Sequence, residues 1–323
     1  MKLKVGIIGG AGYTAGELIR LLINHPNVEI SFVHSTSNAG NRVADVHEGL
    51  IGETDLTFAE TFSLQEIDAL FLCSGHGDSR MFMQTHSIPD SLKIIDLSTD
   101  FRHKDAAEGF VYGLPELNKT SIRTASRIAC PGCFATAIEL ALLPLAANQL
   151  LKDEIHVNAI TGSTGAGVKP GTTTHFSWRA DNISIYKPFE HQHLQEIKES
   201  LLQLQPEWVS PLNFIPVRGN FTRGIFVSAY TSCHLPQKEI ENLYFDFYSN
   251  AAFTFITDNL PDLKQATNTN KCILSLEKHE TRLLIISVID NLLKGASGQA
   301  VQNFNLMFGL DEKAGLMLKG NGF

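Results

Sequence analysis

The first hundred residues alternate between short apolar runs and stretches with the period of a helix. Residues 2–8, 28–34, 69–73 and 93–97 are mostly apolar, and an amphipathic segment, Glu17–Ile23, separates the first two. Strands that are apolar on both faces and are separated by helices are typical of a parallel sheet covered on both sides. The N-terminal part is therefore predicted to be an α/β domain with a parallel sheet.

A glycine-rich turn joins the first strand to the first helix. Its sequence is Gly9-Gly10-Ala11-Gly12-Tyr13-Thr14-Ala15-Gly16, with the spacing G-x-x-G-x-x-A. Glycines at such a turn let backbone N–H groups approach a pyrophosphate at the helix start. We predict a Rossmann-type dinucleotide-binding domain, the alternative being an ordinary strand–helix turn. The expected cofactor contacts on this turn are Gly9, Gly12, Tyr13 and Thr14.

The end of the second strand bears on the choice of cofactor. It reads Ser35-Thr36-Ser37-Asn38 and lacks the Asp or Glu that would accept a hydrogen bond from an unmodified ribose. The sequence therefore permits NADP and does not favour NAD. Ser35 and Thr36 are predicted to contact the cofactor, as is Gly75, which follows the carboxyl end of the third run.

Beyond Leu151 the pattern changes. Strands are predicted at 155–160, 225–231, 272–277 and 283–289, with helices near Leu194–Leu204 and Lys238–Tyr248. Less regular crossovers of this kind indicate an α+β domain with a mainly antiparallel sheet. The closing stretch, residues 295–309, is predicted to be a helix that ends at glycine.

Composition narrows the class of protein. A chain of 323 residues is long enough for two domains, and 43% hydrophobic with 19% charged residues is ordinary for a soluble globular protein. A net charge of −8 without a Lys/Arg run argues against nucleic acid. The longest apolar stretch, Ala135–Leu151, contains Glu139 and is shorter than the ~20 residues of a membrane span.

The cysteines favour a reducing compartment. They are odd in number and scattered, and the N-terminus runs straight into a strand instead of a secretory leader. We therefore expect a cytoplasmic protein. The five are Cys73, Cys130, Cys133, Cys233 and Cys272.

Cys133 is the candidate nucleophile. It follows Pro131-Gly132 and opens a strongly apolar helix. The positive end of the helix macrodipole and its unpaired N–H groups stabilise a thiolate at this position. The alternatives are a buried core cysteine and, because Cys130 lies three residues earlier, a redox dithiol or half of a zinc site. No second Cys-x-x-Cys completes four sulfur ligands, so no metal site is predicted.

Two further segments carry candidate chemistry. His191-Gln192-His193 stands at the entrance of a predicted helix, and an imidazole could exchange a proton with Cys133. A solvated loop pair or two metal ligands remain alternatives. The glycine-rich Thr161–Lys169 has Val168 where a nucleotide phosphate loop needs Lys, so it is either a structural turn or an oxyanion contact.

Several motifs together resemble the N-acetyl-γ-glutamyl-phosphate reductase family, the arginine-biosynthesis relatives of aspartate-semialdehyde dehydrogenase, from Val5 to Leu316. The motifs are the glycine turn at 9–14, Ile95-Asp96-Leu97-Ser98-Thr99-Asp100-Phe101-Arg102, Tyr112-Gly113-Leu114-Pro115-Glu116, Pro131-Gly132-Cys133, His191-Gln192-His193 and residues 290–300, DNLLKGASGQA. The chain departs from the family at Cys130, usually Asn, at Phe134-Ala135, usually Tyr-Pro, and at Thr36, where Arg is common.

The resemblance implies an NADP-dependent phosphorylating semialdehyde dehydrogenase. The Cys133 thiolate would displace phosphate from an acyl phosphate, and hydride from NADPH would reduce the thioester to a γ-semialdehyde. Residues 1–132 and 296–323 would form the NADP-binding domain, and 133–295 the catalytic domain with the subunit contacts of a homo-oligomer, a dimer or tetramer.

We therefore predict reduction of N-acetyl-glutamyl 5-phosphate, a small-molecule acyl phosphate, with no nucleic-acid or membrane partner. His193 is expected to be the acid/base because the apolar residue after it fixes it by packing, and His191 to touch substrate. Alternatives are an N-succinyl-glutamyl or aminoadipyl phosphate as substrate, and a non-catalytic thiol switch or nucleotide sensor using Cys130 and Cys133. Further predicted contacts are Ser163, Arg102 and Arg223 to substrate and Asn291 to cofactor.

Overall fold

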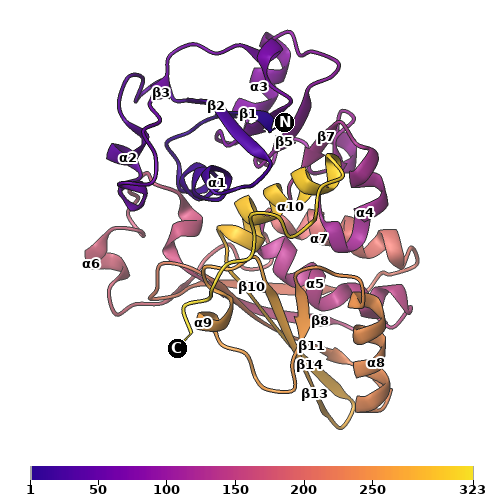
Figure 1. Ribbon diagram of the computed structural model, residues 1–323. Coiled ribbons are helices and arrows are strands. Elements are labelled where there is room, and N and C mark those ends of the chain that lie inside the picture. The colour runs from indigo at the N-terminus through magenta and orange to yellow at the C-terminus, as the bar shows by residue number, and fades with distance from the viewer. Residues whose placement is uncertain (1, 323) are drawn as a thin grey trace. The chain divides into compact units, whose positions relative to one another are not determined.

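The structure is a computed structural model that describes residues 2–322, and its chain divides into two compact units (Figure 1). The first unit comprises residues 2–131 and 296–317. The second comprises residues 132–295 and 318–322. The chain therefore crosses from one unit to the other three times, after Pro131, after Gly295 and after Met317.

The first unit is built on a seven-stranded sheet in the order β3-β2-β1-β4-β5-β7-β6. Each neighbouring pair in it is parallel, which confirms the predicted Rossmann-type sheet. The strand order reverses between β1 and β4, the position at which ligands bind in open parallel sheets. The strands are β1 (Leu3–Ile8), β2 (Val28–His34), β3 (Phe58–Ala59), β4 (Ala69–Leu72), β5 (Lys93–Asp96), β6 (Val111–Tyr112) and β7 (Arg127–Ala129).

The final helix, α10 (Gly298–Met307), lies in the core of the first unit and is buried along its whole length. Phe304 packs against Phe71 of β4, with 5.8 Å between ring centroids. Two of its buried side-chain amides make hydrogen bonds, since Asn303 Nδ2 donates to Gly113 O at 2.8 Å and Asn305 Oδ1 lies 3.0 Å from His25 Nε2. The other helices of this unit are α1 (Tyr13–Ile23), α2 (Val43–Val46), α3 (Asp78–Thr85) and α4 (Pro115–Thr124), with short 3₁₀ turns at Glu48–Leu50, Leu64–Glu66 and Lys104–Ala106.

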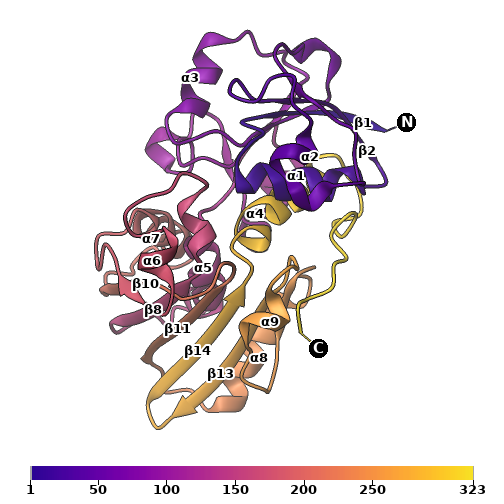
Figure 2. The ribbon, with the colours of Figure 1, turned by 90° about the vertical axis from the view of Figure 1, so that its left-hand side faces the viewer.

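The second unit is built on a mixed sheet in the order β12-β13-β14-β11-β8-β10-β9 (Figure 2). Its pairs are antiparallel except β12–β13 and β8–β10, so the prediction of a mainly antiparallel sheet is confirmed. The strands are β8 (Ile155–Thr161), β9 (Ser184–Ile185), β10 (Leu212–Arg218), β11 (Ile225–Ser232), β12 (Thr254–Ile256), β13 (Cys272–His279) and β14 (Arg282–Ile289).

Helix α5 (Cys133–Ala147) is buried on every side from Phe134 to Ala146, which explains its mostly apolar sequence. Pro144 has no N–H, so the carbonyl of Leu140 lacks its helical donor. The Tyr248 hydroxyl of α8 (Gln237–Tyr248) donates to that carbonyl at 2.5 Å.

The other helices of this unit are α6 (Phe176–Arg179), α7 (His193–Leu204) and α9 (Leu263–Ala266), with a 3₁₀ turn at Ser163–Ala166. A π-turn at Leu293–Ser297 leads into the first unit.

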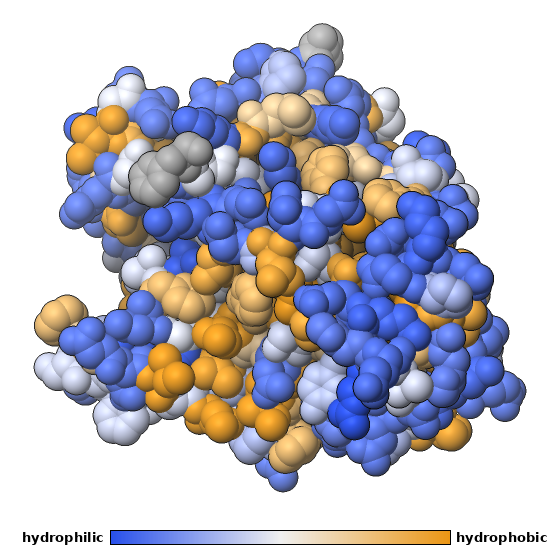
Figure 3. Space-filling view, turned by 90° about the horizontal axis from the view of Figure 1, so that it is seen from below, coloured by the Kyte–Doolittle hydropathy of each residue, from blue (hydrophilic) through white to orange (hydrophobic). Residues whose placement is uncertain are grey.

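One face of the second sheet packs on α5, and α9 covers the β13–β14 part of the other face. The part of this second face that α9 does not cover carries half-buried apolar side chains. Among them, Ile160 of β8 stands opposite Phe226 of β11 on one side and Val217 of β10 on the other. Ile215 and Tyr230 share their face by strand alternation. Figure 3 shows one side of the molecule, on which apolar residues gather in a patch among polar ones.

Two features are absent from residues 2–322 of the chain. No helix there has both the length and the apolar content to cross a membrane. No group of three or more His, Cys, Asp or Glu side chains within the same residues is arranged to hold a metal ion.

Candidate active site

Cys133 is the first residue of α5, and the turn before it is tightly held. The cap residue Gly132 has extended backbone angles, and its carbonyl accepts the first helical hydrogen bond from Thr136 N at 2.9 Å. The Gly132 N–H donates to Glu196 Oε2 at 2.8 Å. Glu196 is buried on α7, so this bond ties the start of α5 to α7. Cys133 itself is half-buried.

The same turn explains how His193 is placed. A Cβ atom on Gly132 would lie only 2.3 Å from His193 Nε2, so the imidazole rests directly on the Gly132 backbone. His193 is the first residue of α7 and is buried. The structure therefore brings the predicted acid/base residue against the residue that precedes Cys133.

His191 lies behind His193 and has a different environment. Its Nδ1 accepts a hydrogen bond from His193 N at 3.3 Å, and the two ring centroids are 4.6 Å apart. Burial lowers the pKa of His191 to about 4, and Lys187 lowers it further while Glu196 opposes the change. His191 is therefore neutral at pH 7 and stabilises the start of α7 as a hydrogen-bond acceptor.

A third backbone segment closes on Cys133 from the turn after β14. A Cβ atom on Gly295 would lie 2.7 Å from Cys133 Cβ, and Gly295 N donates to Asp290 O at 2.9 Å. Gly295 belongs to the π-turn Leu293–Ser297, a geometry that is frequent at functional sites. Cys133 is thus held by glycine backbone before it in the chain and across from it.

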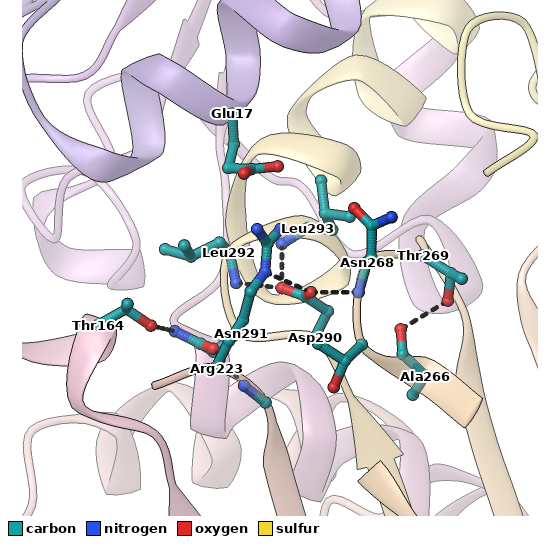
Figure 4. A network of polar contacts seen from close by, with 12 residues as sticks. Glu17, Thr164, Arg223, Ala266, Asn268, Thr269, Asp290, Asn291, Leu292 and Leu293 are labelled. Atoms are coloured by element: carbon teal, nitrogen blue, oxygen red, sulfur yellow. Dashed lines mark hydrogen bonds and ion pairs between the residues drawn. The ribbon is translucent and has the colours of Figure 1, made fainter. Parts of the chain in front are cut away.

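Asp290 organises this turn (Figure 4). Its Oδ2 accepts from Arg223 Nε at 2.6 Å and from Asn268 N at 2.7 Å. Its Oδ1 accepts from Leu292 N at 2.8 Å and Leu293 N at 3.0 Å. Arg223, a predicted substrate contact, is thereby oriented by a buried carboxylate.

Asn291 links three loops through its side-chain amide (Figure 4). Its Oδ1 accepts from Gly224 N at 2.7 Å, and its Nδ2 donates to Thr164 Oγ1 at 3.0 Å. Ser163 N donates to Phe221 O at 2.9 Å, so Ser163 and Arg223 lie on adjoining loops. The contacts of Asn291 with cofactor and of Ser163 and Arg223 with substrate stay predictions.

In the first unit, the glycine turn is open on one side, and its contact with a pyrophosphate stays a prediction. Gly9 has a positive φ of 78°, and a Cβ there would lie 2.8 Å from the backbone of Cys73 and Ser74. At Gly12, a Cβ would meet no atom of the described chain within 4 Å. The first N–H groups of α1, from Tyr13 and Thr14 on, have no helical acceptor, so they are available to an anion.

The remaining predicted cofactor residues lie at the carboxyl edge of the same sheet. After β2, Ser35 and Asn38 form a polar turn in which Asn38 Nδ2 donates to Ser35 Oγ at 3.3 Å, and Thr36 is exposed. Gly75 is exposed in the loop after β4. This turn holds hydroxyl and amide groups and no carboxylate, which fits a ribose 2′-phosphate better than a free 2′-hydroxyl.

Arg102 follows β5 at this edge of the first unit. It is buried, and its Nη2 donates to Leu97 O at 3.0 Å. Asp100, two residues earlier, caps α3 by accepting from Gly77 N at 2.7 Å and Arg80 N at 3.0 Å. The loops after β4 and β5 are therefore joined, and the role of Arg102 in substrate binding stays a prediction.

Cys130 differs sharply from Cys133. It is buried at the end of β7, where Asn303 Nδ2 donates to its Sγ at 3.7 Å. Burial raises the pKa of the Cys130 thiol to about 12. The thiol is therefore protonated at neutral pH, which disfavours the dithiol interpretation. None of the five cysteines forms a disulfide.

Reasoning from sequence missed four residues around the nucleophile. Glu196 lies three positions after His193, a helical spacing that could have indicated it. Arg179 ends the short helix α6, Tyr186 follows β9 and Arg218 ends β10, and no motif marks them. Tyr186 packs edge-on against His191, with 5.7 Å between ring centroids.

Comparisons with known proteins agree with this geometry. Residues 4–125 match the family model described as semialdehyde dehydrogenase, NAD binding domain, and residues 133–291 match the semialdehyde dehydrogenase dimerisation domain. N-acetyl-gamma-glutamyl-phosphate reductase of Azobacteroides pseudotrichonymphae is 67% identical over 99% of both chains. That of Parabacteroides distasonis is 61% identical over 99% of this chain and 100% of its own.

The chain belongs to the N-acetyl-γ-glutamyl-phosphate reductase family.

Solved structures show the same fold at low identity. Aspartate semialdehyde dehydrogenase II from Vibrio cholerae has a TM-score of 0.74 at 16% identity and covers 96% of this chain and 99% of its own. The aspartate semialdehyde dehydrogenase from Candida albicans with NADP has a TM-score of 0.71 at 14% identity, covering 95% of this chain and 99% of its own.

The contact of Gly295 with Cys133 gives a first prediction. Gly295→Ala would place a methyl group 2.7 Å from Cys133 Cβ and displace the thiol. We expect kcat/KM to fall by about 100-fold, since sub-ångström to ångström misplacement of a reacting group has effects of this size. Gly171→Ala, whose Cβ has only an ordinary 3.5 Å contact with Thr174 Oγ1, is the control and should retain activity. Equal activity in both variants would contradict the assigned position of Cys133.

Proposed function

We propose that the chain catalyses the NADPH-dependent reduction of N-acetyl-glutamyl 5-phosphate to N-acetyl-glutamate 5-semialdehyde and phosphate, in arginine biosynthesis. Full-length relatives named for this reaction support it. The observation that carries the mechanism is the placement of Cys133 at the start of α5, with His193 against the preceding residue.

In the first half-reaction, Cys133 attacks the acyl carbon of the substrate. His193 accepts the thiol proton, the bond between the acyl carbon and the phosphate oxygen breaks, and phosphate leaves with the electron pair. A thioester on Cys133 remains. The N–H groups of the first turn of α5 stabilise negative charge that develops beside Cys133.

NADPH would be held by the glycine turn at Gly9–Gly12 and by the polar turn after β2. Bound there, the cofactor supplies the hydride that converts the thioester to the aldehyde. His193, now protonated, stabilises the developing oxyanion and, when the bond between the carbon and Cys133 Sγ breaks to release the aldehyde, returns its proton to the thiolate. These steps return His193 and Cys133 to their starting state.

The environments of the two histidines favour His193 for this work. A pKa of about 4 keeps His191 unprotonated at neutral pH, and its Nδ1 is already engaged by His193 N. His191 is therefore assigned to shaping the pocket beside the nucleophile. The absence of a disulfide among the five cysteines supports a reducing compartment, and we propose that the enzyme works in the cytoplasm.

The overall proposal is tested in the reverse direction. The purified enzyme should form NADPH from NADP only when N-acetyl-glutamate semialdehyde and phosphate are both present. Formation of NADPH without phosphate, or none with the complete mixture, would refute the proposed reaction.

We also propose that the enzyme is a homo-oligomer that associates through the open face of the second sheet. Residues 133–291 match a dimerisation-domain model, and that face carries Ile160, Ile215, Val217, Phe226 and Tyr230. An apolar sheet face of this kind is expected to be covered by a partner.

A charge on that face tests the interface. Ile215→Asp should shift the molar mass measured by light scattering toward that of one chain, because burying an unpaired carboxylate is costly. The control is Val209→Asp, at a position that is 93% exposed outside the strands, and it should leave the mass unchanged. An oligomer that persists in Ile215→Asp would place the interface elsewhere.

The two neighbouring cysteines give a direct prediction for the nucleophile. Cys133→Ala should lower kcat by on the order of 10³-fold or more while NADPH affinity stays close to wild type. Cys130→Ala should retain most activity, because that thiol is buried and protonated. Steady-state kinetics and calorimetric titration measure both effects, and comparable loss in the two variants would support the dithiol interpretation instead.

The histidines are distinguished by the pH dependence of Cys133 alkylation. His193→Gln removes the imidazolium that stabilises the thiolate, so the pH midpoint for reaction with iodoacetamide should rise, and kcat should fall roughly 100-fold. His191→Asn keeps an acceptor near the Nδ1 position, so the midpoint should stay constant. A shift in His191→Asn alone would reverse the assigned roles.

A further inference from the structure

Arg218 occupies an unusual position at the end of β10. Its guanidinium lies over the Tyr186 ring, 4.7 Å from the centroid, and its Nη1 donates to Thr173 Oγ1 at 3.2 Å. Its Nε is buried and has no hydrogen-bond partner among the described residues. The stacking fixes the plane of the guanidinium and leaves donor capacity unused.

A second arginine lies beside it. Arg179 ends α6 and is 7% exposed, and its Nη2 donates to Asn182 O at 2.8 Å. Its Nη1 is 3.5 Å from the hydroxyl of Ser184, the residue opposite Arg218 in the β9–β10 ladder. Its Nε is also buried without a partner in residues 2–322. Burial and the charge of Arg218 both lower the pKa of Arg179.

These two cations lack a protein counter-charge. Throughout residues 2–322, no ion pair involves Arg179 or Arg218, although Arg223 and Arg20 each have a carboxylate partner. Neighbouring guanidiniums that are partly desolvated repel each other and leave donors unpaired, which is unfavourable unless an anion binds between them. The arrangement is therefore suited to an anionic ligand.

The cluster adjoins the nucleophile. Tyr186, on which Arg218 stacks, contacts His191, and His191 contacts His193. Burial raises the pKa of the Tyr186 hydroxyl, and the nearby Cys133 thiolate adds to that change while Arg218 opposes it. The Tyr186 hydroxyl is therefore close enough to both the Cys133 sulfur and the Arg218 guanidinium to be affected by their charges.

We propose that Arg218, with Arg179 beside it, binds a carboxylate of the acyl-phosphate substrate and so orients the acyl carbon toward Cys133. Tyr186 is the positioning residue, because its ring holds the plane of the Arg218 guanidinium. A planar guanidinium matches a carboxylate with two parallel hydrogen bonds. In N-acetyl-glutamyl 5-phosphate this is the α-carboxylate of the glutamyl unit, whereas an N-succinyl group, on the alternative substrate, would offer a second carboxylate. This proposal rests on the proposed function for the identity of the substrate.

The first test uses the charge of an alkylating reagent and requires no turnover. Iodoacetate carries a carboxylate and iodoacetamide does not, so the ratio of their second-order rate constants at Cys133 reports the anion site. In Arg218→Gln this ratio should fall about tenfold, the lower end of the effect of a local charged field on a reacting anion. Arg282→Gln, an exposed arginine at the start of β14, changes net charge equally and should keep the wild-type ratio.

An unchanged ratio in Arg218→Gln would overturn the site while leaving Cys133 as nucleophile. Loss of reaction with both reagents in the wild type would instead overturn the proposed function. Arg218→Lys keeps the positive charge but loses the planar guanidinium, and its ratio of iodoacetate to iodoacetamide rate constants should stay close to that of the wild type. If Arg218→Gln does not fold, Arg179→Gln is measured in its place with the same expectation.

The second test identifies which carboxylate binds. The reverse reaction is assayed with N-acetyl and N-succinyl glutamate semialdehydes, and Arg218→Gln should raise KM for the semialdehyde more than it lowers kcat. A rise for both substrates assigns the α-carboxylate, whereas a rise only for the succinyl compound assigns the acyl carboxylate. A rise confined to the KM for phosphate would overturn the proposal, as would unchanged KM values for both semialdehydes.

Discussion

The catalytic arrangement depends on the close approach of the cap of α5 to the first turn of α7. Gly132 has no side chain, so His193 rests on its backbone, and the Gly132 N–H donates to Glu196 at 2.8 Å. Any Cβ at Gly132 would collide with the imidazole. The helix terminus proposed to stabilise the Cys133 thiolate and the imidazole proposed to receive its proton are therefore fixed by the same contact. Gly295 applies a second constraint from the turn after β14.

Each unit contributes through a different physical property. In the first unit, parallel strands end at one edge where backbone N–H groups are free for phosphate, and a wholly buried helix, α10, completes the core. In the second unit, antiparallel strands support α5, and loops tied by Asp290 and Asn291 surround its first turn. Buried carboxylates and amides, each with its hydrogen bonds satisfied, hold these loops in one arrangement.

Periodicity predicted the fold well because most strands have unbroken apolar or alternating patterns. It missed β10 and β9, and also the short strands β3, β6 and β12. Pro216 interrupts β10, and proline within a run argues against a strand, yet here it stands opposite Ala159 in a parallel pair. Strand β9 has only two residues and no pattern of its own. Such elements form because the neighbouring strand provides their hydrogen bonds.

From the sequence, we could predict only those residues of the candidate site that lie in a recognisable local motif. A cysteine after Pro131-Gly132 at a helix start indicated the nucleophile, and the pair of histidines indicated the base. The choice between Cys130 and Cys133 needed burial, which is a property of the fold. Arg218, Arg179 and Tyr186 could not be predicted, because they meet across the β9–β10 edge and carry no motif.

The most direct test of this account is to trap the covalent intermediate. Enzyme mixed with N-acetyl-glutamyl phosphate in the absence of NADPH, quenched in acid and digested, should yield one peptide whose mass is increased by the N-acetyl-glutamyl group. Fragmentation should assign that increase to Cys133. An adduct on Cys130, or release of phosphate by the active enzyme with no adduct on any cysteine, would contradict the account.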